Sequence, residues 1–454
     1  MDDRELVRRI WARDASVWTS SGEEQWLGWL DEPSRIRPQA RELVEFADAV
    51  VEELDDVVLL GMGGSSLAPE VLRRPFDATN LHVLDTTHPR AIRELESKLD
   101  LSRTLFVSAS KSGSTLETRS HTDYFWEKTG GRGSQFVAIT DPGSSLEGLA
   151  KERGFRAVFS GEPSIGGRYS ALSPFGIVPA ALMGIEIDAL LDRAEDMAGQ
   201  CREEDDGNPG LELGLAFGHS ALHGRDKVCI RETSGKFGLW AEQLLAESTG
   251  KDGKGLIPAP GEDPRAADRQ PAVPLIGEPL DIGAEFFRWE FATAVAGHLL
   301  RINPFDQPNV QEAKDRTKQV LDSGDDPPLE PESTPDLLFA QARPGDYVCL
   351  QAFVHETADA DEALFDLARR AREETGCVVT TGYGPRYLHS TGQLHKGGPP
   401  TGLFLQIVDD TGDELPIPGQ PFGFGRLIRA QAAGDYASLK ERGRRVVRVR
   451  LEDL

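Results

Sequence analysis

The stretch VVLLGMGGSSLAPEVLRR (residues 57–74) reads as a strand, a tight turn and a helix, because a short apolar run breaks into glycines and then into a helical pattern. The same alternation recurs at LHVLDTT (81–87), at RTLFVSAS (103–110) before KSGSTLETRSHTDYFWEK (111–128), and at SQFVAITD (134–141) before SSLEGLAKERG (144–154). Short β-rich runs that alternate with helical segments indicate parallel strands joined by crossover helices. The sequence therefore predicts an α/β fold.

The pattern extends along the rest of the chain. Residues 1 to about 50 have a helical apolar pattern, and β-rich runs with intervening helices return after residue 226. Three segments rich in proline, glycine or acidic residues are predicted to be a domain boundary (201–210), a long loop (252–284) and a surface linker (322–336). We expect two domains, 1–200 and 201–454, the first including the N-terminal helical segment and the second a C-terminal extension.

Length and charge restrict the class of protein. A chain of 454 residues exceeds the size at which single hydrophobic cores stop growing. Its formal charge of −25, from 50 Lys and Arg against 75 Asp and Glu, argues against nucleic acid or an anionic membrane as the main partner. An anionic substrate would then need a locally basic pocket.

The cysteines and the apolar runs indicate the compartment. Cys201, Cys229, Cys349 and Cys377 are isolated and show no CxxC spacing, so we expect neither a disulfide framework nor a zinc site. The first residues, MDDRELVRRIW, contain no apolar signal core, and no run approaches the roughly 18 apolar residues of a membrane helix. We expect a soluble, cytoplasmic protein.

Two loops at predicted strand ends are candidate anion sites. Backbone amides in GMGGSS (61–66) would favour an anion, although a tight turn between strand and helix explains the glycines equally well. In SASKSGSTLET (108–118) five hydroxyls, those of Ser110, Ser112, Ser114, Thr115 and Thr118, gather with one ammonium at a helix start, where capping needs only one such residue. This composition suits a phosphate monoester.

Three further segments carry charged side chains, each with a plain alternative. Arg168 in GGRYS could face a developing oxyanion or lie on the surface. Glu247, at the end of an apolar helix, could be a general base if partly desolvated, or a solvated helix-end residue. In NPFDQPNVQEAK (303–314), Asp306 could be a helix cap and Lys314 a solvated residue.

The stretch GPRYLHSTGQLHKGG (384–398) places His389 and His395 among glycines and hydroxyls. They could be metal ligands, a catalytic pair or ordinary loop residues. Their spacing of six puts them on different helical faces, and no Asp, Glu or Cys joins them, which disfavours a metal site.

Five segments in this order resemble glucose-6-phosphate isomerases: GMGGS, SASKSGSTLET, GGRYS, QLLAESTGK and FDQPNVQEAK. The resemblance runs from WARDASVW (11–18) to the C-terminus and is greatest to the isomerase portion fused behind transaldolase in some bacteria, here without a transaldolase domain. It implies two sugar-isomerase (SIS) domains, each a parallel-stranded sheet flanked by helices in three αβα layers.

The resemblance implies that one group of residues binds the substrate. Ser110, Ser112, Thr115 and Thr118 would hold the phosphate; Gly64, Ser65 and Lys111 would line the sugar side; Gln243 and Gln307 would contact the substrate. It also implies catalytic roles for four residues. Glu247 would move a proton between C2 and C1 through a cis-enediol, Arg168 would stabilise the enediolate, and Lys314 would assist His389 in ring opening.

The chain departs from the family pattern in two places. Asn309 and Gln311 replace the glycine and glutamate of FDQ-x-G-V-E, which leaves the surroundings of Lys314 in doubt. The family's ring-opening histidine segment, G-x-R-x-Q-H-x-x-x-Q-L, usually precedes the lysine segment, where this chain has only His298, an expected core residue. GPRYLHSTGQL matches it later in the chain, so we expect a relocated element with His389 as acid/base and His395 structural.

We therefore expect an aldose–ketose isomerase, an intramolecular oxidoreductase of glycolysis and gluconeogenesis that needs neither a metal nor another cofactor. The resemblance implies a homodimer, in which the histidine can come from the partner chain. Alternatives are an isomerase of another sugar phosphate, including mannose 6-phosphate, and a non-catalytic sugar-phosphate-binding SIS protein. A nicotinamide-dependent dehydrogenase is disfavoured because GxGxxG is broken, and a DNA-binding sensor because no basic arm is apparent.

Overall fold

The computed structural model describes residues 2–204, 207–233, 235–324, 327, 329–409 and 412–454, without the side chains of residues 310–313. Its first sheet has five parallel strands in the order β2-β1-β3-β4-β5. They are β1 (Asp56–Gly61), β2 (Leu81–Leu84), β3 (Thr104–Ala109), β4 (Phe136–Thr140) and β5 (Ala157–Ser160). Strands β1, β3 and β4 are buried almost throughout, and parallel sheets covered on both faces give such continuous apolar runs.

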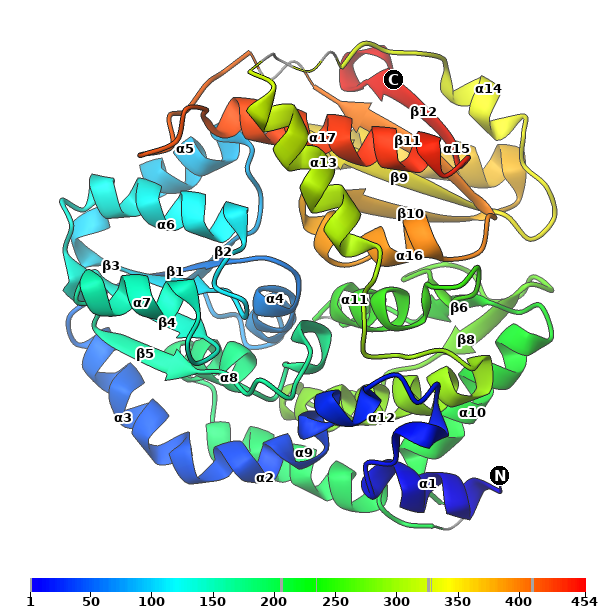
Figure 1. Cartoon of the computed structure of the whole chain (residues 1–454), viewed down its shortest axis with the longest axis horizontal. Coiled ribbons are helices and arrows are strands. Elements are labelled where there is room, and N and C mark those ends of the chain that lie inside the picture. Colours follow the sequence, from blue (N-terminus) through cyan, green and yellow to red (C-terminus); the bar gives the residue numbers. More distant parts are fainter. Residues whose placement is uncertain (1, 205–206, 234, 325–326, 328, 410–411) are drawn as a thin grey trace.

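Helices cover both faces of this sheet (Figure 1). They are α4 (Leu67–Arg73), α5 (Pro89–Lys98), α6 (Leu116–Lys128), α7 (Ser145–Glu152) and α8 (Pro174–Leu182). Alternate residues of β1 belong to different clusters, since Val57 and Leu59 pack with α8 residues whereas Val58 and Leu60 pack with Tyr124 of α6. The predicted α/β pattern of this region is confirmed.

Three helices that precede the predicted boundary pack beneath this unit: α2 (Glu32–Ile36), α3 (Ala40–Val51) and α9 (Ile187–Gln200). The first helix, α1 (Asp3–Trp11), lies apart from them at the lower right of Figure 1, where Trp11 stacks on Phe287. Asp2 caps α1 by accepting a hydrogen bond from the amide of Glu5 at 2.8 Å.

The remainder of the chain contains two further parallel sheets. One has the order β7-β6-β8 and the other β10-β9-β11-β12. The strands are β6 (Lys227–Ile230), β7 (Ile257–Pro258), β8 (Arg269–Ala272), β9 (Tyr347–Phe353), β10 (Val378–Tyr383), β11 (Gly402–Val408) and β12 (Arg445–Arg450). The long loop predicted at 252–284 is thus wrong in part, because β7 and β8 are too short and proline-containing to give a strand pattern.

Eight helices surround these sheets in the described residues. They are α10 (Pro209–Leu222), α11 (Gly238–Thr249), α12 (Ile282–Leu300), α13 (Val310–Asp322), α14 (Pro335–Phe339), α15 (Ala358–Thr375), α16 (Gly392–Gly397) and α17 (Phe424–Glu441). In Figure 1 the late helices α13 and α17 cross the upper part of the molecule to the right of the first unit, and α16 lies below them next to α11. Residues far apart in sequence thereby meet where the two halves face each other.

The largest hydrophobic cluster runs from Leu6 to Phe305 and includes residues of α1, β1, α11 and α12. It crosses the segment 201–210, of which residues 205–206 lie outside the described part of the chain. The division into domains 1–200 and 201–454 stays a prediction.

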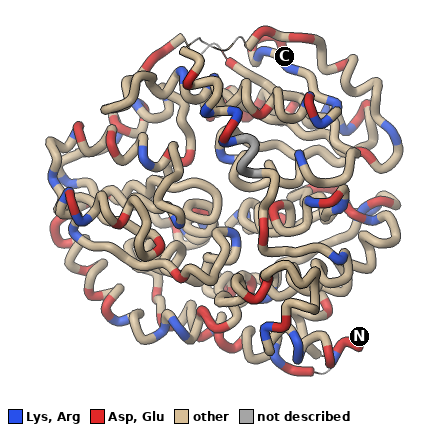
Figure 2. Tube along the Cα trace, in the orientation of Figure 1, with Lys and Arg blue, Asp and Glu red and all other residues tan. Residues whose placement is uncertain are grey.

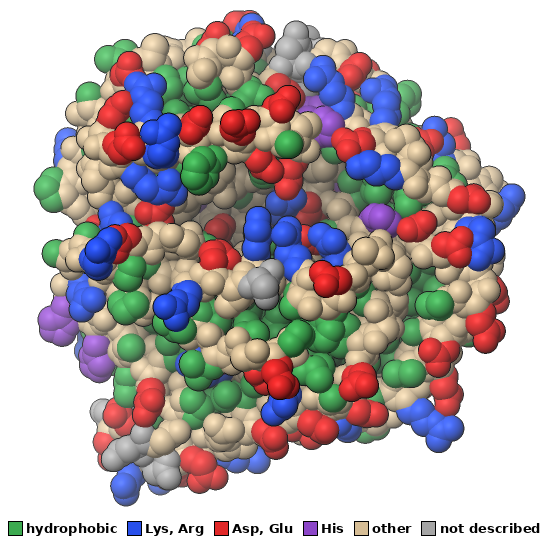
Figure 3. Space-filling model, turned by 180° about the vertical axis from the view of Figure 1, so that it is seen from behind, with side chains coloured by type: hydrophobic (Ala, Val, Ile, Leu, Met, Phe, Trp, Pro, Cys, Tyr) green, Lys and Arg blue, Asp and Glu red, His purple; other side chains and the backbone are tan. Residues whose placement is uncertain are grey.

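The acidic excess is distributed unevenly. Residues of both signs are spread along the outer helices (Figure 2), whereas Lys and Arg side chains gather around a hollow near the middle of the face seen from behind (Figure 3). None of the helices in the described ranges combines the length and apolar character that crossing a bilayer requires.

Candidate active site

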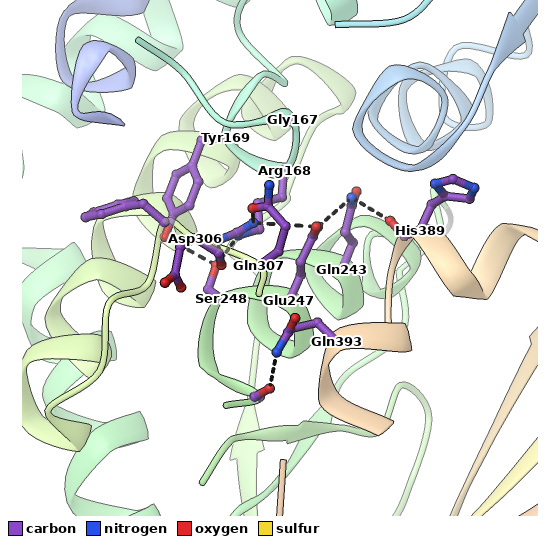
Figure 4. A network of polar contacts seen from close by, with 12 residues as sticks. Gly167, Arg168, Tyr169, Gln243, Glu247, Ser248, Asp306, Gln307, His389 and Gln393 are labelled. Atoms are coloured by element: carbon purple, nitrogen blue, oxygen red, sulfur yellow. Dashed lines mark hydrogen bonds and ion pairs between the residues drawn. The ribbon is translucent and has the colours of Figure 1, made fainter. Parts of the chain in front are cut away.

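Arg168 occupies the centre of a buried polar network (Figure 4). It lies in a short 3₁₀ turn, Gly167–Tyr169, and is only 2% exposed. Its guanidinium donates to Ser248 Oγ at 2.7 Å, Gln307 Oε1 at 2.9 Å, and the carbonyls of Pro304 and Asp306 at 2.7 and 2.9 Å. The surface alternative for this arginine is therefore excluded, and Gln307 is brought to it as part of the same network.

Glu247 faces this arginine from α11. Its Oε1 lies 3.6 Å from Arg168 Nη1, and its side chain is 14% exposed. Gln243, one turn earlier on α11, donates from Nε2 to Glu247 Oε2 at 3.0 Å and to the carbonyl of His389 at 2.8 Å. Glu247 is thus a partly desolvated carboxylate held between a guanidinium and an amide, and Figure 4 shows Gln243 between Glu247 and His389.

The glycines after β1 pack directly against two other parts of the site. Gly63 has φ +55°, and a Cβ there would lie 2.5 Å from the carbonyl oxygen of His389. A Cβ on Gly64 would lie 2.0 Å from the carbonyl oxygen of Gly167. Close backbone approach therefore explains both glycines. Ser65, predicted to line the sugar side, is buried in the same turn.

The predicted phosphate loop joins β3 to α6. Ser110 Oγ and Thr115 Oγ1 are 2.9 Å apart, as are Ser112 Oγ and Ser114 Oγ. Thr115 is the N-cap residue of α6, but its side chain makes no capping hydrogen bond. That side chain therefore leaves the first-turn amides able to donate to an anion at the loop. Thr118 Oγ1 is buried and has no hydrogen-bond partner among the described atoms.

Lys111 differs from the other loop residues. Its ammonium pairs with Asp141 and donates to the carbonyl of Glu162 at 2.9 Å. The ammonium is thus already held by two oxygens, and its contact with the sugar stays a prediction.

His389 ends a 3₁₀ turn, Arg386–His389, and contacts α6 of the first unit. Its Nε2 lies 2.8 Å from Glu117 Oε1, and both side chains are largely buried, at 17% and 8% exposure. Burial alone would raise the pKa of Glu117, but the charge and hydrogen bond of His389, a backbone hydrogen bond and the charge of Lys314 lower it to about 2. Glu117 is therefore an ionised partner for the imidazole.

Sequence reasoning missed Glu117. It lies within SASKSGSTLET, where the hydroxyls drew attention, and a lone carboxylate in a phosphate loop was the available signal. Its role becomes visible only with His389, which follows it in sequence by 272 positions.

One cavity of about 450 Å³ joins several of the predicted residues. Ser114, Thr115, Glu117, Lys314 and His389 line it together. The exposed Lys314 side chain thus faces the imidazole that the late segment supplies. Among the described residues, this lining does not include Arg168 or Glu247, which lie beyond Gln243.

The segment that carries His389 is anchored by Gln393. Its side chain donates to the carbonyl of Gly250 at 2.9 Å and to Asn309 Oδ1 at 2.7 Å, and its Oε1 accepts from the amide of Asn309 at 2.9 Å. Asn309, which replaces a family glycine, thus connects the lysine segment to the histidine segment; the side chain of Gln311 lies outside the described residues.

The alternative role of Asp306 as a helix cap is wrong. Asn309 occupies the N-cap position of α13, whereas Asp306 Oδ1 lies 2.5 Å from Nζ of the buried Lys251. Burial and the charge of Arg168 lower the pKa of Lys251 to about 8.

The other two histidines considered in the sequence, His395 and His298, make structural contacts. His395 is 2% exposed, its Nδ1 lies 3.2 Å from Gln351 Nε2, and burial lowers its pKa well below the ordinary value. The structural role expected for His395 fits these contacts. His298 is half-buried rather than a full core residue, and its Nδ1 approaches the carbonyl of Val17 at 2.5 Å. Among the described residues, no cluster of three His, Cys, Asp or Glu side chains is arranged to hold a metal ion.

Comparison with known proteins finds similarity to glucose-6-phosphate isomerases in sequence and in structure. Residues 39–212 match the family model of phosphoglucose isomerase. A glucose-6-phosphate isomerase of Trichormus variabilis is 34% identical over 43% of this chain and 40% of its own length, and one of Acaryochloris marina is 30% identical over 55% and 50%. The chain therefore spans about half the length of the curated relatives it matches. The crystal structure of a glucose-6-phosphate isomerase from Chlamydia trachomatis has a TM-score of 0.59 at 19% identity, covering 72% of this chain and 85% of that one, which supports the shared α/β fold.

Proposed function

We propose, from the fit of this chain to the glucose-6-phosphate isomerase family, that it interconverts D-glucose 6-phosphate and D-fructose 6-phosphate through a cis-enediol intermediate. The observation that carries the proposal is the convergence of Ser114 and Thr115 of the hydroxyl loop, the His389–Glu117 pair and Lys314 on one cavity, whose lining does not include Ser110, Ser112 or Thr118. Gln243 connects that cavity to the carboxylate of Glu247.

The hydroxyl loop would hold the phosphate. The hydroxyls of Ser110, Ser112, Thr115 and Thr118 stand at the N-terminus of α6, where backbone amides and the helix dipole favour an anion. Gly64, Ser65 and Lys111 would border the sugar. Contacts to a non-reacting phosphate orient the carbon atoms that react.

His389 would open the sugar ring. Because Glu117 is ionised, His389 Nε2 keeps its proton toward it, and the imidazole acts as a base in its neutral form, with the lone pair of Nδ1 facing the substrate. Nδ1 would take the proton of the anomeric hydroxyl while Lys314, on the same cavity, gives a proton to the ring oxygen. The C1–O5 bond then breaks and leaves an open-chain aldehyde.

Glu247 would carry the proton between carbons. Its carboxylate removes the proton from C2, and the electron pair forms the C1–C2 double bond as the aldehyde oxygen gains negative charge. Transfer of the O2 proton to O1 and return of the abstracted proton to C1 then give the ketose, with its carbonyl at C2, so no electrons enter or leave the substrate. Arg168, a buried cation 3.6 Å from the carboxylate, stabilises the charge on the enediolate, and Gln243 and Gln307 orient its oxygens.

The same proposal includes the setting of the enzyme. We expect an intramolecular oxidoreductase of glycolysis and gluconeogenesis, located in the cytoplasm and forming a homodimer. A broader specificity that includes mannose 6-phosphate is the alternative, because the described groups act on C1, C2 and the phosphate without defining the configuration at C2.

A coupled assay tests the proposal. Purified protein is given fructose 6-phosphate, and glucose 6-phosphate is detected with a dehydrogenase, with mannose 6-phosphate measured in parallel. Glu247→Gln keeps the size of the side chain and removes the base, so we expect kcat to fall by about 10²–10⁴ with the fold intact. A wild-type protein that isomerises neither sugar would overturn the proposed function.

A further inference from the structure

Gln431 lies on α17 and is 3% exposed, between two residues of the first unit. Thr87 Oγ1 donates to Gln431 Oε1 at 2.7 Å, and Gln431 Nε2 donates to Glu117 Oε1 at 2.7 Å. The same Glu117 oxygen meets His389 Nε2 at 2.8 Å. A continuous line of hydrogen bonds therefore runs from the end of β2 to the imidazole.

We infer that Gln431 is a positioning residue that holds Glu117 ionised and aimed at His389; this inference rests on the proposed function. Glu117, which as a carboxylate only accepts, selects the orientation in which the NH₂ group of Gln431 faces it, and the Thr87 hydroxyl then donates to the carbonyl oxygen of Gln431. An amide in that orientation only donates to the carboxylate, which favours the ionised form of Glu117.

The charges around Glu117 agree with this role. His389 from the late segment and Lys314 from α13 face it as cations or donors. His121, one turn further along α6, has its pKa lowered to about 4 by burial and bonds through Nε2 to the carbonyl of Thr86 at 3.0 Å, so it adds no charge at neutral pH. Gln431 is a neutral donor among these groups. It restrains the carboxylate of Glu117 by a hydrogen bond and leaves the contact between Glu117 and the imidazole in place.

Gln431 also borders the cavity, so the test must distinguish a positioning role from contact with the substrate. A loss of kcat at nearly constant KM indicates positioning. In Gln431→Leu we expect kcat to fall about 10–100-fold, the size of effect that small displacements of catalytic groups produce, with KM changed less than about twofold. The loss of a donor raises the pKa of Glu117, so the acidic limb of the kcat profile moves to higher pH.

Gln406→Leu is the matched control. Gln406 is also buried beside α17, where it donates to the carbonyl of Ala432 at 2.9 Å and accepts from Arg448 at 2.7 Å, away from Glu117. Gln406→Leu should lower the free energy of unfolding about as much as Gln431→Leu does, and it should leave the pH profile of kcat unchanged. A pH profile that is unmoved in Gln431→Leu, with a kcat loss equal to that of the control, would overturn the inference. So would a rise in KM at unchanged kcat.

Gln431→Glu should change the other side of the pH profile of kcat, toward higher pH. The introduced carboxyl can donate to Glu117 only while it is protonated, and two facing carboxylates repel once it ionises. We expect a new decline of kcat as pH rises, in contrast to the acidic-limb shift of Gln431→Leu. Equal profiles for the two variants would contradict a donor role.

A readout without substrate keeps the inference separate from the proposed function. Carboxyl ¹³C NMR of glutamate-labelled protein, with the Glu117 signal identified through Glu117→Gln, reports the ionisation of that group directly. We expect the signal of Gln431→Leu to titrate at least about one pH unit higher than that of the wild type. An unchanged titration overturns the inference even if the wild type isomerises both sugars, whereas a shifted titration supports it even if neither is a substrate.

Discussion

Thr118 has a side chain whose arrangement does not stabilise the ligand-free protein. Its hydroxyl is buried without a partner among the described atoms, and a buried unpaired polar group costs free energy in the ligand-free protein. Thr122, one turn later on α6, has the opposite arrangement, since its Oγ1 meets Ser108 Oγ at 2.8 Å and donates to the carbonyl of Thr118 at 2.7 Å. The two threonines form a natural pair for experiment.

Thr118→Val should leave the melting temperature unchanged or raise it, because no hydrogen bond is lost in the free protein. It should raise KM about 10-fold, since a hydrogen bond to a charged phosphate is lost. Thr122→Val should instead lower the free energy of unfolding by about 1 kcal/mol without changing KM. Thermal melts and steady-state kinetics decide this, and an unchanged KM in Thr118→Val would remove Thr118 from the phosphate site.

Glu117 should couple stability to pH. Its folded pKa of about 2 lies below its ordinary value of 4.5, so its stabilising contribution is fully present above about pH 4.5 and disappears as pH falls toward 2. The difference in unfolding free energy between wild type and Glu117→Gln should therefore shrink from pH 6 to pH 3. Denaturant unfolding at both pH values measures it, and a constant difference would mean that Glu117 is not held as an anion.

At the scale of elements, the turn between β1 and α4 has little room for change, because two loops approach its backbone. Gly64→Ala would place a Cβ 2.0 Å from the carbonyl oxygen of Gly167, so the Arg168 turn must move. We expect a loss of about 1–3 kcal/mol in unfolding free energy and a fall in kcat.

Gly148→Ala supplies the comparison. Gly148 lies within α7, and a Cβ added there would have no described atom within 4 Å outside its own helix backbone and chain neighbours, so alanine should stabilise by about 0.5–1 kcal/mol. Urea unfolding of both variants checks the pair. If Gly64→Ala were as stable as Gly148→Ala, the close approach of the two turns would be refuted.

The elements also show what could be predicted from sequence. β1, β3 and β4 were predictable because each is a buried apolar run that ends in a turn, as in VVLLGMGGSS, whereas the half-buried edge strand β5 was missed. β7 and β8 were missed because both are short and contain proline. Glu247 and Arg168 could be proposed from their segments, but Glu117 and Gln431 gain meaning only from contacts across 272 and 314 positions, which local patterns do not encode.

At the scale of the whole molecule, one chain supplies all the groups of the candidate site. His389 reaches Gln243 and Glu117 within the same chain, so we expect each chain to supply its own histidine. Even if the protein is a homodimer, we expect the specific activity per chain to stay constant when the protein is diluted into the monomeric range. Activity across a dilution series, compared with sedimentation at the same concentrations, tests this; activity that disappears together with the dimer would show that the partner completes the site.

The two-way amide contact between Gln393 and Asn309 has a consequence for biosynthesis. It ties the lysine segment to a stretch that the ribosome makes much later, and α17, which carries Gln431, is made later still. The first sheet can form while translation continues, but its hydroxyl loop then faces an unfinished pocket. Catalytic competence should appear abruptly once α17 has left the exit tunnel, rather than grow with chain length.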